Sequence, residues 1–282
     1  MATAAIAARV LPLPAKKAIY ANPTVARLIR STLNRGAQAG VTMTSIAAGN
    51  LAGMKLYLDL QSEKDYWLGT YEPGLQTAIC QFVKPGFVAY DVGAHIGYIT
   101  LQLAKGVGPG GQVTAFEALP ANLERLEKNL KLNDLKERVE VVSAAVVDRT
   151  GEVNFLIGPS IGTGKAEGSR GRNLDSDGGS LVVNGIAIDD FVFAHAKHPP
   201  DFIKIDIEGG EVLALQGMRR VLDEIRPILF LEIHGPEAAA GVWDILDEAI
   251  YLMHRLGKGY PEVSRQRDLR WKEYLVAFPQ DR

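Results

Sequence analysis

Two carboxylates end neighbouring apolar runs in the first half of the chain. Asp91 follows one run and opens the heptapeptide Asp-Val-Gly-Ala-His-Ile-Gly. The glycines of this stretch, Gly93 and Gly97, let the backbone approach a ligand because no Cβ is in the way. Glu117 ends the next apolar run. A carboxylate about 20 residues beyond a glycine-rich turn is typical of sites that accept hydrogen bonds from ribose hydroxyls, so the pattern indicates a nucleoside-binding turn.

The glycine spacing of this turn bears on which nucleoside is bound. The pattern is Gly-x-x-x-Gly, whereas pyrophosphate binding to a dinucleotide uses Gly-x-Gly-x-x-Gly and bare helix N–H groups. Asp91 would repel a phosphate but can order the cationic amino-acid part of S-adenosylmethionine. The residues therefore favour S-adenosylmethionine, and an NAD-dependent oxidoreductase remains as the alternative.

Candidate catalytic groups stand at the ends of two later strands. Lys204 and Asp206 are two positions apart in an apolar run, so they share one face of a strand. Asp206 is nearer the carboxyl edge and is the first choice for orienting an acceptor. His234 follows the next apolar run and is the best general base on chemistry, because imidazole titrates near neutral pH. We predict Asp206, His234 and Lys204 as the catalytic set.

A metal site is the weaker interpretation of the same region. Asp206, Glu208, Glu232 and His234 could together bind Mg²⁺, because oxygen ligands suit this ion. Glu208 also has a structural interpretation, since acids at the start of a helix interact favourably with its dipole. We predict no resident metal.

Strands and helices alternate along most of the chain, which predicts an α/β protein with a doubly wound, mostly parallel sheet. The last two strands are connected without a helix and are expected to pair antiparallel. A polar segment at 158–179 is a candidate substrate loop. Strands are predicted at 54–60, 87–90, 112–116, 139–147, 152–157, 180–188, 201–207, 226–233, 260–264 and 273–278, and helices at 75–83, 99–105, 119–132, 208–222 and 241–256.

Length and composition fit one large domain with an N-terminal extension. The chain has 282 residues and a net charge of −2, which gives no general reason to expect nucleic acid as a partner. No apolar run reaches the roughly 18 residues that span a bilayer, so a cytoplasmic location is expected. The single cysteine, Cys80, excludes an internal disulfide and is expected to be a core residue.

The N-terminal part differs in charge from the rest, since no acidic residue precedes Asp59. Asn22 and Pro23 open a helix signal in which Val25, Leu28, Ile29 and Leu33 share one face. We therefore predict residues 1–50 as an extension with an amphipathic helix, and residues 51–282 as the main domain.

From Gly69 to its end, the chain resembles the FkbM family of methyltransferases. The resemblance rests on the order and spacing of several blocks. They are the segments 69–72, 90–98, 116–122, 145–151, 188–191, 202–211, 215–218 and 227–232.

The resemblance implies a class I methyltransferase fold, which is Rossmann-like with a seven-stranded, mostly parallel sheet and an antiparallel C-terminal strand. It also implies O-methylation of a hydroxyl on a sugar or another small natural product. The chain departs from the family pattern at His95, where Asn is usual, and at Ala118, where Pro is usual. The donor contacts it implies are Tyr71, Glu72, Asp91, Gly93, Ala94, His95, Gly97, Glu117, Ala118 and Ala145.

Two further functions remain open at this stage. A nucleic-acid methyltransferase is disfavoured, because the only Pro-Pro pair, at 199–200, is not followed by an aromatic residue and Cys80 is badly placed for cytosine chemistry. The second open function is that of a non-catalytic module that binds the donor. The expected partner is a small hydroxyl-bearing acceptor, and the sequence does not specify the oligomeric state.

Overall fold

The computed structural model describes residues 40–158, 163–170 and 179–280. The predicted N-terminal amphipathic helix lies outside these residues. No helix in the described ranges is long and apolar enough to cross a membrane.

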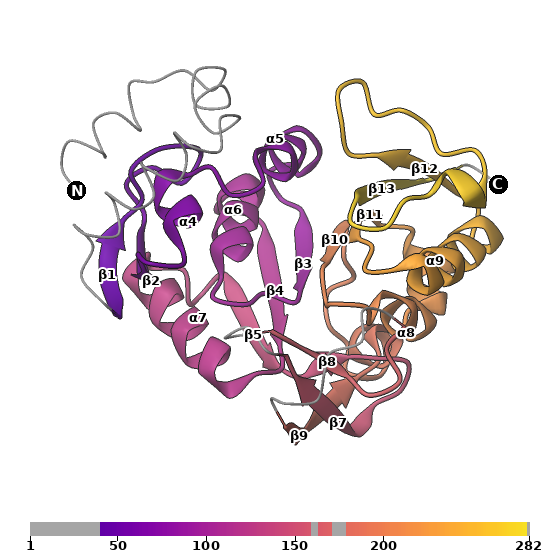
Figure 1. Ribbon diagram of the computed structural model, residues 1–282, viewed down its shortest axis with the longest axis horizontal. Helices are drawn as coiled ribbons and strands as arrows, with labels where there is room; N and C mark the ends of the chain where they lie inside the picture. Colours follow the sequence, from indigo (N-terminus) through magenta and orange to yellow (C-terminus); the bar gives the residue numbers. More distant parts are fainter. Residues whose placement is uncertain (1–39, 159–162, 171–178, 281–282) are drawn as a thin grey trace.

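A seven-stranded sheet forms the centre of the molecule, in the order β12-β13-β11-β10-β3-β4-β5 (Figure 1). Its neighbouring strands pair parallel, except that β13 is antiparallel to both β11 and β12. The predicted doubly wound sheet with an antiparallel C-terminal strand is therefore confirmed. The strands are β3 (Val88–Val92), β4 (Gln112–Glu117), β5 (Val139–Ser143), β10 (Phe202–Ile205), β11 (Ile228–Glu232), β12 (Tyr251–Arg255) and β13 (Tyr274–Pro279).

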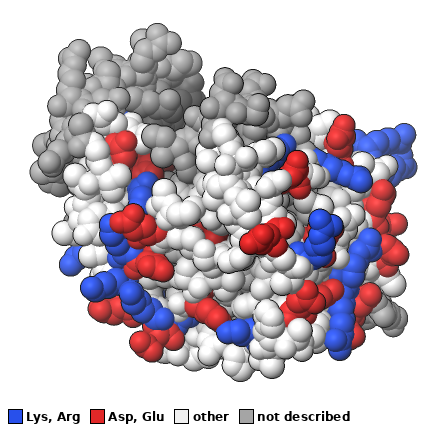
Figure 2. Space-filling view, turned by 90° about the horizontal axis from the view of Figure 1, so that it is seen from below, with Lys and Arg blue, Asp and Glu red and all other residues white. Residues whose placement is uncertain are grey.

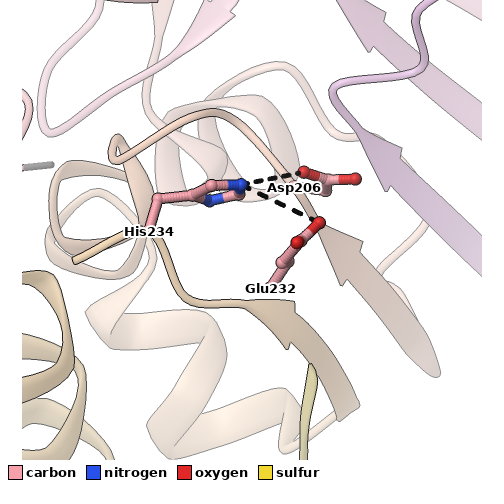
Figure 3. Close-up of side chains that lie close together, drawn as sticks. All are labelled: Asp206, Glu232 and His234. Atoms are coloured by element: carbon pink, nitrogen blue, oxygen red, sulfur yellow. Dashed lines mark ion pairs between the residues drawn. The ribbon is translucent and has the colours of Figure 1, made fainter. Parts of the chain in front are cut away.

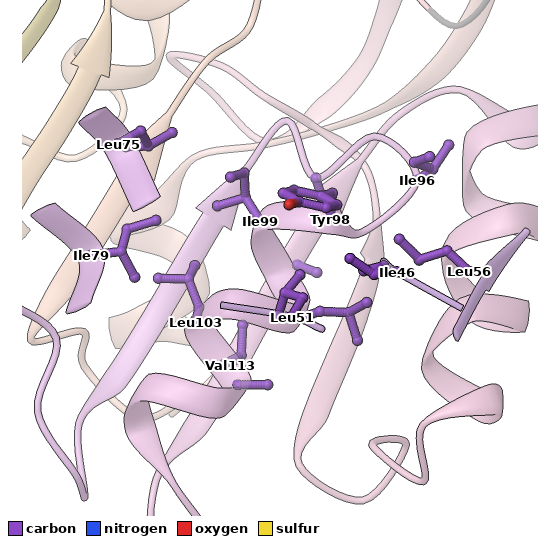
Figure 4. Packing of buried hydrophobic residues seen from close by; sticks show 14 of the residues in the cluster. Ile46, Leu51, Leu56, Leu75, Ile79, Ile96, Tyr98, Ile99, Leu103 and Val113 are labelled. Carbon is purple, nitrogen blue, oxygen red and sulfur yellow. The ribbon is translucent and has the colours of Figure 1, made fainter. Parts of the chain in front are cut away.

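Helices cover both faces of this sheet (Figure 1). Side chains that alternate along a strand enter two separate apolar clusters: Phe202 packs in one and Ile203 in the other. Figure 4 shows the first cluster, in which Leu75, Ile99 and Leu103 pack together. The first face carries α5 (Pro73–Phe82), α6 (Tyr98–Val107) and α7 (Pro120–Leu132), and the second carries α8 (Glu211–Gln216) and α9 (Pro236–Glu248).

The segment after β5 builds a second, four-stranded sheet in the order β6-β9-β7-β8. The prediction of one strand over 139–147 is wrong, because the chain leaves the central sheet after Ser143 and pairs with β9 instead. Part of the predicted loop 158–179 also forms a strand. The four strands are β6 (Ala145–Val146), β7 (Gly151–Ile157), β8 (Gly164–Ala166) and β9 (Ser180–Ile186).

Three sequence-based expectations for the C-terminal part are wrong. The helix predicted at 241–256 ends at Glu248, and Ile250 has a positive φ of 60° that stops it. The antiparallel partners of β13 are β11 and β12, whereas residues 260–264 contribute only an isolated bridge, from Glu262 to His254. The helix predicted at 208–222 begins only at Glu211 and is interrupted after Gln216, and the chain becomes helical again from 219 into the π-helix η3 (Val221–Ile225).

Residues 41–50 pack against the domain. Strand β1 (Val41–Ser45) pairs antiparallel with β2 (Lys55–Asp59), and Ile46 and Leu51 are fully buried in the first apolar cluster. A short helix, α4 (Lys64–Leu68), follows β2. We therefore propose that the main domain includes residues 41–50 rather than beginning at 51.

Cys80 is exposed on α5, so its expected place in the core is wrong. The helical spacing around it is real, but the thiol lies on the outward side, where Asn50 Nδ2 donates to its Sγ at 3.1 Å.

Candidate functional site

The turn between β3 and α6 is held from both sides by neighbouring strand ends. Gly93 has φ 78°, and a Cβ there would lie 2.1 Å from the backbone oxygen of Asp206. The N–H groups of Gly93 and Ala94 both donate to the carbonyl of Phe116 at 3.0 Å. Gly97 has φ 91°, a conformation that favours glycine. The turn's shape therefore depends on close backbone contact with β4 and with the chain after β10.

Glu117, at the end of β4, is hydrogen-bonded to this turn. Its Oε2 accepts from the backbone N–H of His95 at 2.8 Å. Its Oε1 accepts from the backbone N–H of Leu119 at 2.8 Å and from Asn122 Nδ2 at 3.2 Å. Burial raises the pKa of Glu117, and these hydrogen bonds offset part of that rise. The side chain is a buried carboxylate at the carboxyl edge of the sheet.

A cavity of about 220 Å³ opens between the turn, the ends of β4 and β10, and the first residues of the second sheet. Seven of the predicted donor-contacting residues line it: Tyr71, Gly93, Ala94, His95, Glu117, Ala118 and Ala145. Asp91, Gly97 and Glu72 are not among its lining residues. Of the predicted catalytic residues, Lys204 and Asp206 line it and His234 does not.

Asp91 lies behind the turn. It is fully buried, and Thr100 Oγ1 donates to its Oδ2 at 2.7 Å. Its Oδ1 is 3.3 Å from Lys204 Nζ, which is 3.7 Å from Asp206 Oδ2 and donates to the carbonyl of Gly93 at 3.0 Å. Burial lowers the pKa of Lys204, but the charges of Asp91 and Asp206 outweigh burial and raise it. Lys204 therefore remains charged and links the turn to Asp206.

Asp206, Glu232 and His234 converge beyond the end of β10 (Figure 3). His234 Nε2 is 3.7 Å from Asp206 Oδ1 and 3.8 Å from Glu232 Oε2. Glu208 Oε2 is also 3.8 Å from this nitrogen. On the other side of the ring, Nδ1 donates to Glu211 Oε1 at 2.8 Å. Four carboxylates thus surround one imidazole.

The pKa values of these groups follow from this crowding. Burial lowers the pKa of His234, but the hydrogen bond to Glu211 and the nearby carboxylates outweigh burial and raise it to about 9. Burial and the charge of Asp206 raise the pKa of Glu232 to about 8. Burial also raises the pKa of Asp206, but Lys204 and His234 lower it below its ordinary value. Asp206 therefore remains ionised at neutral pH.

Three tyrosines form one wall of the cavity. The ring centroids of Tyr66 and Tyr71 are 4.5 Å apart, and those of Tyr66 and Tyr98 are 4.8 Å apart. Burial raises the pKa of Tyr98 to about 12 and raises that of Tyr71 further. Both phenols therefore remain neutral at physiological pH. Next to this wall, Glu72 has a positive φ of 39°, and its buried Oε2 has no hydrogen-bond partner.

Sequence reasoning missed three residues of this region, Tyr66, Tyr98 and Tyr274, as functional candidates, and it left Glu211 between a functional role and that of a favourable acid at a helix start. Tyr274 Oη donates to Asp206 Oδ2 at 3.1 Å. Glu211 carries a recognisable signal, because it opens a helix at the end of a strand that holds other charged residues. The tyrosines carry no comparable signal, since buried aromatic residues are common in any core.

The strand order, the antiparallel β13 and a cavity at the carboxyl edge together define a class I methyltransferase fold. The chain belongs to the FkbM methyltransferase family, because the model of the Methyltransferase FkbM domain matches residues 91–260. The strand-end blocks that carry the resemblance in the sequence lie largely within this range.

Among relatives, the hexuronic acid methyltransferase AglP of Haloferax volcanii is 26% identical over 182 residues, which cover 64% of this chain and 68% of that protein. A protein-L-isoaspartate O-methyltransferase of Caenorhabditis elegans is 27% identical over 117 residues, covering 40% of this chain and 52% of that protein. The structure of methyltransferase FkbM from Methylobacillus flagellatus matches with a TM-score of 0.46 at 18% identity, over 78% of this chain. The match spans about half of that longer chain, 53%.

Proposed function

We propose that this methyltransferase uses S-adenosylmethionine and transfers its methyl group to a hydroxyl oxygen of a sugar or a related small molecule. One observation carries the proposal. Glu117 and Asp206 line the same cavity from the ends of different strands, with the glycine turn among the other lining residues. Glu117, assigned to the ribose of the donor, and Asp206, assigned to the acceptor, thus line the same cavity. In-line transfer requires both bound molecules to be held in one such space.

The residues present fit the donor. Protein N–H groups fix the orientation of Glu117: Oε1 accepts two hydrogen bonds and Oε2 accepts one from His95. Since a carboxylate oxygen has two lone pairs, Oε2 can also accept from a ribose hydroxyl. The close contact of Gly93 with Asp206 leaves no room for a side chain on that side of the turn. When bound, S-adenosylmethionine supplies a methyl group on a sulfonium that is already activated for displacement. The protein's remaining task is to orient the acceptor and its proton.

Asp206 is the residue we assign to the acceptor. Tyr274 donates to Oδ2, and Lys204 lies 3.7 Å from the same oxygen, so two groups fix the carboxylate's orientation. His234 lies behind Asp206, where it can hold or move a proton. We assign Lys204 a positioning role, because its ammonium is placed among Asp91, Asp206 and the carbonyl of Gly93.

Two further observations support a small acceptor. The relative from Haloferax volcanii is named as a hexuronic acid methyltransferase, which favours a sugar. On the face shown in Figure 2, Lys and Arg side chains are interspersed with Asp and Glu, an arrangement that does not favour a polyanionic partner there.

The proposal is tested by incubating the protein with S-adenosylmethionine carrying a labelled methyl group and an extract of small metabolites. We expect label in an alkali-stable ether product, identified by mass. A labelled methyl ester would assign the transfer to a carboxyl group, and label only in nucleic acid added in parallel would assign it to the nucleic-acid class. Donor binding without turnover on any pool would support a non-catalytic module.

Replacing Glu117 by Gln is expected to weaken donor binding about 10- to 100-fold at neutral pH, because a hydrogen bond to a charged group contributes about 1.5–3 kcal/mol. Burial raises the pKa of Glu117, so in the wild type the carboxylate takes up a proton at a higher pH than an exposed glutamate does. Donor affinity is therefore expected to fall as the pH drops through that raised pKa. Calorimetric titrations at several pH values measure both effects.

The matched control for this change is Glu127→Gln, on the exposed side of α7. It should keep both the affinity and the pH profile of the wild type. The Glu117→Gln profile should be flatter than that of the wild type. A wild-type affinity in Glu117→Gln would remove the ribose role assigned to this residue.

A further inference from the structure

The three carboxylates around His234 Nε2 lie at distances from this nitrogen that suit a shared ion better than direct hydrogen bonds. The separations of 3.7–3.8 Å from this nitrogen to Asp206, Glu208 and Glu232 exceed hydrogen-bond lengths. Ligand atoms of Asp206, Glu232 and His234 all lie within 4.8 Å of one another. Two ligands that each bind an ion at about 2.1 Å can be up to about 4.2 Å apart, so a small rotation of the side chains closes the site.

The orientation of the imidazole is a second, independent observation. Glu211 is fully buried, and its Oε1 accepts from Nδ1 of His234 at 2.8 Å. This bond directs Nε2 at Asp206 and Glu232 (Figure 3). A carboxylate that accepts from one ring nitrogen while the other faces further ligands is the usual support for a metal-binding histidine. The other oxygen of Glu211, Oε2, is buried without a hydrogen-bond partner.

The charges around the cluster are unbalanced. Glu208 and Glu211 add two carboxylates beside His234 to those of Asp206 and Glu232. Besides the imidazole of His234 itself, the nearest cations are Lys204, which also faces Asp91, and Lys165, which interacts with Glu208 and Glu211. Partly buried carboxylates in excess of their cations are costly to bring together. A bound cation would offset this cost.

We propose that Asp206, Glu232 and His234 bind one divalent cation, with Glu208 as an additional ligand and Glu211 as a positioning residue. An imidazole ligand among carboxylates favours a first-row transition ion such as Mn²⁺ over Mg²⁺, which is bound mainly by oxygen. This site replaces the prediction, made from the sequence, that no metal is resident.

The place of the site indicates what the cation does. Asp206 lines the cavity, whereas Glu232 and His234 do not, so the cation lies at the edge of the cavity on the side assigned to the acceptor. There it binds the acceptor's hydroxyl oxygen and lowers the pKa of that hydroxyl. This role rests on the proposed function, while the binding site itself does not.

The site is tested by titrating the full chain, first treated with a chelator and desalted, with Mn²⁺ and following the electron paramagnetic resonance signal of free Mn²⁺. We expect one site per chain. The changes Asp206→Asn, Glu232→Gln and His234→Gln should each weaken binding at least about 10-fold, and Glu211→Gln should do so by about 10- to 100-fold. Glu127→Gln should bind like the wild type. Absence of binding, or binding that none of the four site changes alters, would overturn the proposal.

Two further measurements separate this inference from the proposed function. Circular dichroism shows whether each variant folds, and a variant that does not fold is replaced by Glu208→Gln, whose side chain is 36% exposed. Mn²⁺ binding at these residues without methyl transfer to any acceptor would leave the site standing and reject the function. Methyl transfer by chelator-treated protein that binds no Mn²⁺ would support the proposed function and reject the metal site.

Discussion

Gly93→Ala is expected to abolish measurable donor binding and to lower the free energy of unfolding by roughly 3–5 kcal/mol. A left-handed backbone costs alanine about 1–2 kcal/mol, and Gly93 has φ 78°. The larger part of the loss in unfolding free energy comes from collision, because the new Cβ would lie 2.1 Å from the backbone oxygen of Asp206 and 2.9 Å from Ile207 Cγ2. Relief would move the turn away from the end of β10. Urea unfolding and calorimetric titration with S-adenosylmethionine measure the two effects.

Substitutions at two other glycines separate the cost of the left-handed backbone from the cost of the collision. Gly86 has a similar φ of 89° but no atom within 4 Å of an added Cβ, so Gly86→Ala should show the backbone cost alone. Gly110 has neither a positive φ nor an atom within 4 Å of an added Cβ. Gly110→Ala should therefore unfold at the same urea concentration as the wild type or at a slightly higher one. If Gly93→Ala lost no more stability than Gly86→Ala and still bound the donor, the close packing of the turn against Asp206 would not matter for the site.

Lys204→Met is expected to lower the free energy of unfolding by about 3–5 kcal/mol, because removing one partner of a buried ion pair leaves the other charge uncompensated. Lys204 is 2% exposed, and its ammonium is 3.3 Å from Asp91 and 3.7 Å from Asp206. Methionine keeps most of the side-chain volume, so the loss reports charge rather than a cavity. Denaturant unfolding at neutral pH measures it.

The control is Lys128→Met, which removes an exposed ion pair with Glu124. Its effect on the free energy of unfolding should be far smaller than that of Lys204→Met, because solvent screens an exposed ion pair. The double change Asp91→Asn with Lys204→Met should cost less than the sum of the two single changes, because it removes both charges together. Additive losses would contradict a direct coupling between these residues.

The donor side of the cavity was predictable because its signals are local. An acid or a glycine at the end of an apolar run is visible in a few consecutive residues. Parallel strands bring such ends to one edge of the sheet. Gly93, Glu117 and Asp206 therefore meet in one cavity although they are far apart in the chain. The sequence could not show that Asp91 lies behind the turn, because that depends on Lys204 and Thr100 closing over it.

The C-terminal part was not predictable in the same way, because two periodicities overlap there. The apolar residues Val242, Leu246, Ala249 and Met253 keep a helical spacing, so the pattern extends the helix beyond its end. The positive φ of Ile250 interrupts the helix, and residues Tyr251–Arg255 then form a strand. The contact of Tyr274 with Asp206 follows from the pairing of β13 with β11, in which Tyr274 lies opposite Glu232, and it has no local signal.

The position of β13 between β11 and β12 also constrains the order in which the sheet can assemble. β12 contacts the rest of the sheet through β13, which follows it in the chain. Residues 251–255 therefore cannot join the sheet before residues 274–279 have done so. The donor turn needs only β3, β4 and the chain around β10, all of which are translated earlier. The strand contacts of the donor turn therefore do not include β13, whereas the hydroxyl of Tyr274 reaches Asp206 only when that strand is in place.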